Sequence, residues 1–138
     1  MSIAISTALE SSFSDAVART RAALASQGFG VLAEIDMRAT LKTKLGEDME
    51  DYLILGACNP PLAHRAVDID RQIGLLLPCN VVVRTDPAEE GRVLVEAMDP
   101  QLLVQVTDEK RLQEVADEVA TKLRAAIDSV SAASIELA

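Results

Sequence analysis

The sequence predicts an α+β fold in one domain spanning residues 1–138, with a mainly antiparallel sheet and helices packed on one face. The 138 residues are 49% hydrophobic and 25% charged, a balance that supports a buried core. Short apolar segments follow one another with glycine or proline turns between them, which favours antiparallel pairing. A parallel unit around the helix after Pro60 is the alternative, because strand–helix–strand is also the pattern of a parallel crossover.

The first third of the chain predicts a strand, a helix, a second strand and a short helix. Alternating segments at residues 3–5 and 29–35 indicate the two strands. Helical spacing of apolar residues indicates helices over residues 13–27 and 37–45. Each helix has a capping residue before it and a glycine after it. These boundary residues are Ser12, Gly28, Asp36 and Gly46.

The middle of the chain predicts the buried centre of the sheet. Residues 52–58 are apolar at nearly every position, as in a strand that is covered on both faces. Asn59 is then a natural N-cap, and Pro60 a natural first residue, for a helix that runs as far as Gly74.

The last third predicts a hairpin and a closing helix. Residues 80–84 and 92–98 indicate strands joined by a polar loop, and Asp99-Pro100 indicates a turn. A helix with one apolar face begins at about Asp108.

The Ser/Ala-rich end of the chain, residues 129–138, is expected to fray. Ile135 and Leu137 could instead add a short strand.

Two Cys-Asn pairs are the most informative motif in the chain. Cys58-Asn59 closes the third predicted strand, Cys79-Asn80 follows Pro78 and opens the fourth, and the chain has no other cysteine. In an antiparallel sheet the end of one strand and the start of the next share an edge, so we expect the two thiols to be neighbours. A parallel crossover would put Cys79 at the opposite end.

These pairs predict a ligand site. Cys58 would precede a helix N-terminus, where free N–H groups and the helix dipole lower a thiol's pKa and can hold an anion. The thiols could bind a soft metal or a small anion, or cycle between redox states. The alternative is that both cysteines are small buried hydrophobic residues beside capping and turn asparagines. The candidate ligand-binding residues are Cys58, Asn59, Pro60, Cys79, Asn80 and Lys44.

Other candidate residues carry charge. His64, the only histidine, has Asp68 one helical turn on, and it is either a base, a third metal ligand or a solvated surface residue. Arg38, Lys42 and Lys44 could hold a carboxylate or phosphate, or could form an outer helix face. Lys44 is the stronger candidate, because its Lys-x-Lys-Leu-Gly block lies just before the helix stop.

The composition argues against several partners. A net charge of −9, with two phenylalanines, one tyrosine and no tryptophan, disfavours nucleic acid, which needs basic and stacking surfaces. No run of 18 apolar residues indicates a membrane span, and the first residues lack the pattern of a secretory signal. Two cysteines are not a disulfide framework, so we expect a cytoplasmic protein with reduced thiols. The common catalytic and nucleotide-binding signatures are absent.

The order of the motifs resembles a known family, the domain-of-unknown-function family numbered 302, over nearly the whole chain. The resemblance implies a β-α-β4-α core of the TATA-binding-protein-like type with short inserted helices, and a homodimer. It implies no activity, and the DNA binding of the fold's namesake does not carry over to an acidic chain. The blocks that carry the resemblance are Gly28-Phe29-Gly30-Val31, Glu34-Ile35-Asp36, Lys42-Thr43-Lys44-Leu45-Gly46, Tyr52 to Pro60, Gly74 to Val83, and Asp99-Pro100.

Two hypotheses of function follow from different classes. The first is a non-catalytic, sensor-like protein that binds a small ligand, metal or anion near the two Cys-Asn motifs. The second is a thiol-dependent redox or sulfur-handling enzyme, with Cys58 as nucleophile and Cys79 as resolving thiol. The sequence names no cofactor. A mean hydropathy of +0.19 adds to the expectation of a symmetric homodimer.

Overall fold

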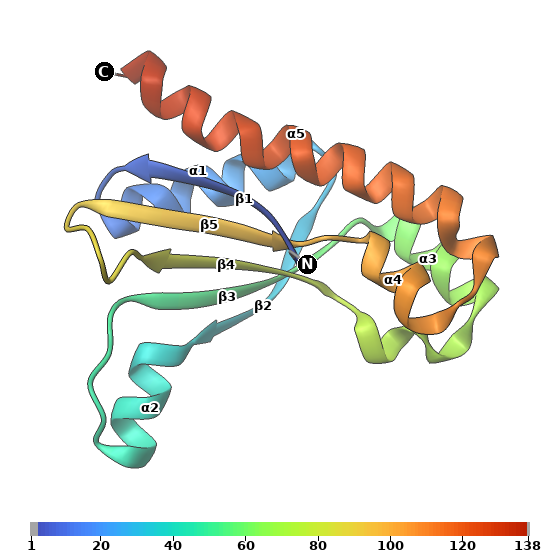
Figure 1. The fold of residues 1–138 in the computed structure, drawn as a ribbon, viewed down its shortest axis with the longest axis horizontal. Helices are drawn as coiled ribbons and strands as arrows, with labels where there is room; N and C mark the ends of the chain where they lie inside the picture. The colour runs from blue at the N-terminus through green and yellow to red at the C-terminus, as the bar shows by residue number, and fades with distance from the viewer. Residues whose placement is uncertain (1–2, 138) are drawn as a thin grey trace.

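The computed structural model describes residues 3–137, with side chains described as far as residue 132. Strands and helices alternate as far as the fourth strand, which is followed directly by the fifth strand and then by the last helices (Figure 1). The strands are β1 (Ala4–Glu10), β2 (Gly30–Asp36), β3 (Tyr52–Cys58), β4 (Cys79–Thr85) and β5 (Arg92–Met98). The helices are α1 (Phe13–Ser26), α2 (Met37–Leu45), α3 (Pro60–Ile69), α4 (Gln101–Thr107) and α5 (Gln113–Leu137), with 3-10 turns η1 (Arg71–Leu76) and η2 (Lys110–Leu112).

The sheet is antiparallel throughout, in the order β1-β5-β4-β3-β2. This confirms the predicted α+β fold class. The parallel alternative is wrong, because β3 and β4 are antiparallel neighbours. The segment of α3 and η1 leaves one end of β3 and returns to that same end to begin β4 (Figure 1).

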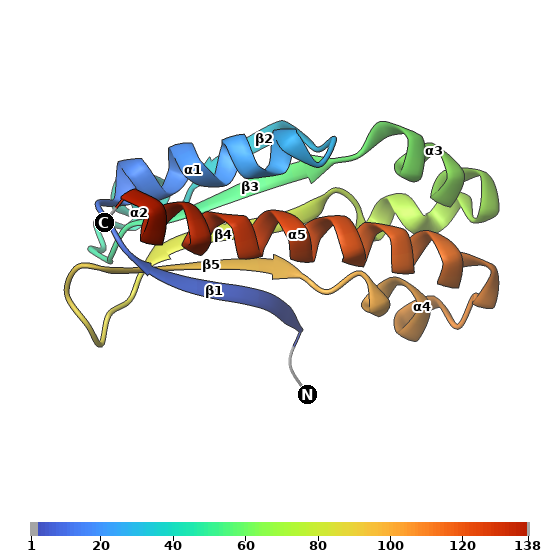
Figure 2. The same cartoon turned by 90° about the horizontal axis from the view of Figure 1, so that it is seen from above.

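Helices α1 and α5 cover one face of the sheet and pack against each other (Figure 2). The core between them is aliphatic, with Leu24, Leu55 and Leu123 fully buried. On the other face, apolar side chains such as Ile54 and Val82 are half-buried. The homodimer expected from the sequence stays a prediction, and this face offers apolar surface for it.

Strand β2 is the least buried strand and departs from the expected alternation. Its register against β3 shifts between Val31 and Ala33, which is a β-bulge. Val31 therefore opposes Ala57 on the helix-covered face, whereas Ile35 opposes Ile54 on the other face. The extra residue reverses the faces of the second half of the strand, and Ile35 becomes 47% exposed.

The predicted boundaries of the first helices are confirmed. The side chains of Ser12, Asp36 and Asn59 each accept a hydrogen bond from the backbone N–H of the third residue of the helix that follows. Gly28 and Gly46, after α1 and α2, have φ values of 84° and 69°, a left-handed conformation that glycine adopts without strain.

The segment after β5 contains a helix that the sequence pattern did not reveal. The Asp99 carboxylate accepts the N–H of Gln101 at 3.0 Å, so the expected turn opens directly into α4. Asp108 then adopts a φ of 54° and ends α4, so the closing helix α5 begins at Gln113 and not at about Asp108.

Helix α5 continues to Leu137, and the fraying expected over residues 129–138 stays a prediction. The short strand suggested at Ile135 and Leu137 is wrong, and Ala138 lies outside the described residues. Among the described residues, no helix combines the length and apolarity needed to traverse a bilayer.

Candidate functional site

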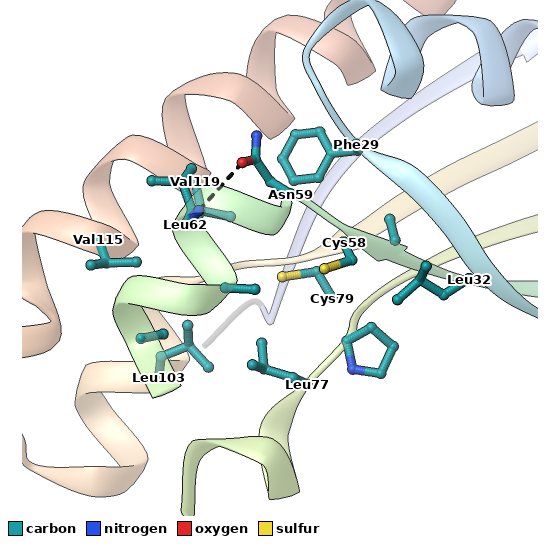
Figure 3. Close-up of a pocket in the computed structure, with 14 residues that line it drawn as sticks. Phe29, Leu32, Cys58, Asn59, Leu62, Leu77, Cys79, Leu103, Val115 and Val119 are labelled. Carbon is teal, nitrogen blue, oxygen red and sulfur yellow. Dashed lines mark hydrogen bonds between the residues drawn. The ribbon is translucent and has the colours of Figure 1, made fainter. Parts of the chain in front are cut away.

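The two Cys-Asn motifs meet at one end of the sheet, as the antiparallel prediction required. The register pairs Ala57 with Cys79, so Cys58 lies one residue beyond the partner of Cys79. Figure 3 shows the two sulfur atoms next to each other, and the electrostatic influence of Cys58 on Cys79 agrees with that proximity. Both cysteines are free thiols.

The cysteines line a cavity of about 260 Å³ between this end of the sheet and helices α3, α4 and α5 (Figure 3). Its walls are almost wholly apolar. They come from five parts of the chain that are separate in sequence, so the cavity exists only in the folded domain. The lining residues are Phe29, Leu32, Ala57, Cys58, Asn59, Leu62, Ala63, Ala66, Leu77, Pro78, Cys79, Leu103, Val115 and Val119.

Burial distinguishes the two thiols. Cys79 is 5% exposed, and burial, reinforced by the neighbouring Cys58, raises the pKa of its thiol to about 11. Cys79 is therefore protonated at neutral pH and is a weak nucleophile. Cys58 is partly exposed, so it is the thiol that solutes can reach first.

The start of α3 offers no donors for an anion. Pro60 and Pro61 occupy its first two positions and carry no N–H group. The N–H of Leu62 donates to the Asn59 side chain at 3.4 Å, and the N–H of Ala63 donates to the Asn59 carbonyl at 2.8 Å. In the first turn, each backbone N–H is either missing or already donates a hydrogen bond. The anion site expected at this helix N-terminus therefore has no free N–H donors to bind an anion.

Asn59 is a structural residue whose side chain is fully used. Its Oδ1 caps α3, and its Nδ2 donates to the carbonyl of Gln27 at 3.4 Å, which ties the start of α3 to the end of α1. At 8% exposed, it is the polar side chain of the cavity wall.

Three of the predicted site residues lie outside the cavity wall. Pro60 is exposed at the first position of α3. Asn80 is exposed and opposes Gly56, on the face of β4 opposite to that of Cys79. Lys44 lies on α2, beyond the other end of β3, so it cannot join a site at the cysteines (Figure 1).

The charged candidates lie on surface helices. His64 is exposed on α3, with its Nε2 3.6 Å from the Asp68 carboxylate. Lys42 pairs with Asp48 at 3.0 Å, among exposed side chains. Among the described residues, no group of three or more His, Cys, Asp or Glu side chains is placed to hold a metal ion.

Sequence reasoning missed the apolar wall of the site. Phe29 just before β2, Leu62 of α3, Leu103 of α4 and Val119 of α5 line one cavity. In the sequence, Phe29, Leu62 and Val119 appear as ordinary core residues, and Leu103 belongs to a helix that the pattern did not predict. Only the packing of α4 and α5 across the end of β3 brings these residues together.

Comparison with known proteins agrees with the order of motifs. A family model described as "Domain of unknown function DUF302" matches residues 5–130. The chain is similar to the crystal structure of an uncharacterized conserved DUF302 protein from Bacillus stearothermophilus, with 27% sequence identity and a TM-score of 0.84. That alignment covers 93% of this chain and 98% of the other. No curated protein matches the chain. The matched residues include both Cys-Asn motifs and all five strands, except for Ala4 at the start of β1. Because the match covers most of the sequence, the chain belongs to the DUF302 family.

Proposed function

We propose that this DUF302 domain is a non-catalytic binding protein for a small, uncharged and largely apolar molecule, held in the cavity beside Cys58 and Cys79. The observation that carries this proposal is the apolar cavity itself. Water gains few hydrogen bonds from such walls, so an apolar molecule that displaces it is bound favourably.

The cavity volume limits the size of the ligand. The value of about 260 Å³ exceeds the roughly 150 Å³ of an apolar cavity that holds benzene. It is slightly below the roughly 300 Å³ at which drug-sized sites begin. A ligand with one or two small rings, or a short aliphatic chain, fits these limits.

The first turn of α3 supports an uncharged ligand. Anion sites at helix N-termini depend on free N–H donors, and here Pro60 and Pro61 supply none. A carboxylate or phosphate in this cavity would lose its hydration without gaining hydrogen bonds to replace it.

The position of the cavity suggests how binding would be sensed. A ligand would contact Leu62 of α3, Leu103 of α4 and Val119 of α5 at once. Binding to the folded state alone would therefore stabilise the packing of α3 and α4 against α5 and raise the melting temperature.

The adjacent thiols favour a second candidate, a thiol-dependent redox or sulfur-handling enzyme. In that case the partly exposed Cys58 is the nucleophile and Cys79 resolves the mixed disulfide. The raised pKa of Cys79 works against this role at neutral pH, because the resolving step needs a thiolate. The apolar ligand is therefore the better-supported function.

A fluorescence titration tests the proposal with 1-naphthylamine, an uncharged and largely apolar probe of two fused rings, which is within the size limit set by the cavity. The test variant is Ala63→Phe, which fills the cavity from α3, and the matched control is Ala120→Phe on α5. Both alanines are partly exposed and helical, but only Ala63 lines the cavity. We expect the wild type and Ala120→Phe to bind the probe alike, and Ala63→Phe to bind it at least about tenfold more weakly.

Circular dichroism of the three proteins confirms that each is folded. Equal probe affinity in Ala63→Phe and the wild type would place the binding outside the cavity and overturn the proposal.

A further inference from the structure

The cavity wall contains two soft donor atoms, the sulfur atoms of Cys58 and Cys79. They come from adjacent antiparallel strands, at positions one residue apart in the register. Figure 3 shows them side by side at the cavity surface. Thiolate sulfur is a ligand for soft metal ions. Two neighbouring sulfur atoms can therefore supply two of the ligands of a metal site.

Other donors are missing from this wall. Both side-chain polar atoms of Asn59 are engaged, one by the N–H of Leu62 and one by the carbonyl of Gln27. His64 is exposed and lies beside Asp68. Among the described side chains, which end at residue 132, no third His, Cys, Asp or Glu joins the two cysteines in a cluster. An ion held here would receive two sulfur ligands.

The number and softness of the ligands select the ion. Zinc takes four ligands in structural sites, and calcium and magnesium require a shell of oxygen atoms. Cu(I) is selected by thiolates and accepts few ligands. We propose that Cys58 and Cys79 form a two-sulfur site for a soft monovalent metal ion, namely Cu(I). This site does not depend on the apolar ligand proposed above.

The reaction balances as an exchange of protons for metal. One Cu⁺ replaces the protons of two thiols, giving a bis(thiolate) complex with one negative charge and releasing two protons. The partly exposed Cys58 leaves this charge in contact with water, unlike that of a carboxylate enclosed in the apolar cavity. The partly exposed Cys58 receives the ion first, and the buried Cys79 completes the complex. The buried Cys79 gives up its proton when the metal displaces it.

The test is a competition titration of the full, reduced chain without oxygen, in which bathocuproine disulfonate competes for Cu(I). We expect one Cu(I) per chain, and X-ray absorption at the copper edge showing two sulfur ligands. Cys58→Ala and Cys79→Ala should each lower the affinity at least about 100-fold, since loss of a ligand costs more than loss of a group that only orients one. His64→Gln and Met98→Leu are the controls, because they remove other metal-ligating side chains, and they should leave the affinity unchanged.

The pH dependence gives a second readout that a merely structural role of the cysteines would not produce. Each displaced proton raises the apparent affinity about tenfold per pH unit, so the affinity should rise at least about tenfold between pH 7 and pH 8. The proposal is overturned if the chain fails to compete for Cu(I), if either single cysteine variant binds as the wild type does, or if the affinity is independent of pH.

Discussion

The two ends of strand β3 have opposite environments. Its carboxyl end, at Cys58, opens into an apolar cavity that α3, α4 and α5 cover. Before its amino end, the Arg38 guanidinium pairs with Asp51 at 2.8 Å, between exposed side chains. Helix α2 packs mainly against β2 and β3, and its side chains are largely exposed (Figure 1). The end of the sheet suited to bind a ligand is therefore the one at Cys58. It is distinguished by the helices that bury it, and not by charged side chains.

The largest contrast is expected from one leucine at each end. Leu62 is 4% exposed at the cavity, whereas Leu45 is 68% exposed on α2. Leu62→Ala should lower the free energy of unfolding by about 2–5 kcal/mol, and Leu45→Ala by less than about 0.5 kcal/mol. Urea denaturation measures both, and comparable losses would mean that the two ends are packed alike.

The second contrast is between the two thiols. Thiolates react with disulfide reagents, and a pKa of about 11 instead of 9.0 leaves about 100-fold less thiolate below pH 9. In Cys58→Ala the contribution of Cys58 is lost, but burial, the larger cause, still raises the pKa of Cys79. We therefore expect Cys79 in this variant to react more slowly than an ordinary cysteine, with a rate that continues to climb above pH 9. A rate that levels off near pH 9 would show that Cys79 is not buried as described.

Two strand glycines give the third contrast. A Cβ atom on Gly56 would lie 2.9 Å from Cγ of Pro78 at the cavity wall, whereas a Cβ atom on Gly30 would meet nothing within 4 Å. Gly56→Ala should therefore cost about 1–3 kcal/mol of stability through overpacking, and Gly30→Ala should cost nothing measurable. Thermal unfolding of both variants tests the difference, and an undisturbed Gly56→Ala would show that Pro78 can move aside.

The smallest contrast is between two helix caps. Asn59 caps α3 and also donates to the carbonyl of Gln27, while Asp36 caps α2 in an exposed position. Asn59→Ala should cost about 1–2 kcal/mol, because it also leaves a partly buried carbonyl without a partner. Asp36→Ala should cost about 0.5–1 kcal/mol. If urea denaturation gave the same loss of unfolding free energy for both variants, the hydrogen bond to Gln27 would contribute nothing to stability.

Local signals in the sequence predict much of this fold. Asn59 and Asp36 mark helix starts by side-chain capping, and Gly46 marks a helix end by its positive φ. These effects act within a few residues, so they can be seen without the tertiary structure. The antiparallel order also places Cys58 and Cys79 together, since it requires only that the chain return to the same end of the sheet.

The remaining features depend on contacts between distant segments or on small insertions. The bulge between Val31 and Ala33 has no clear residue signature, and it reverses the faces of β2 beyond it. The motif that contains Lys44 gives no sign that this residue and the cysteines lie at opposite ends of β3. The proline pair at the start of α3 was visible in the sequence, and its loss of two N–H donors argues against the anion site that the helix N-terminus suggested.

Diffraction from crystals held under xenon gas shows whether the cavity is dry, because dry apolar cavities bind xenon. We expect a xenon atom in the cavity of the wild type, in contact with Phe29, Leu62 and Leu103, and none in Ala63→Phe. A chain of ordered waters hydrogen-bonded within the wild-type cavity, with no xenon, would mean that the cavity is not built for an apolar ligand.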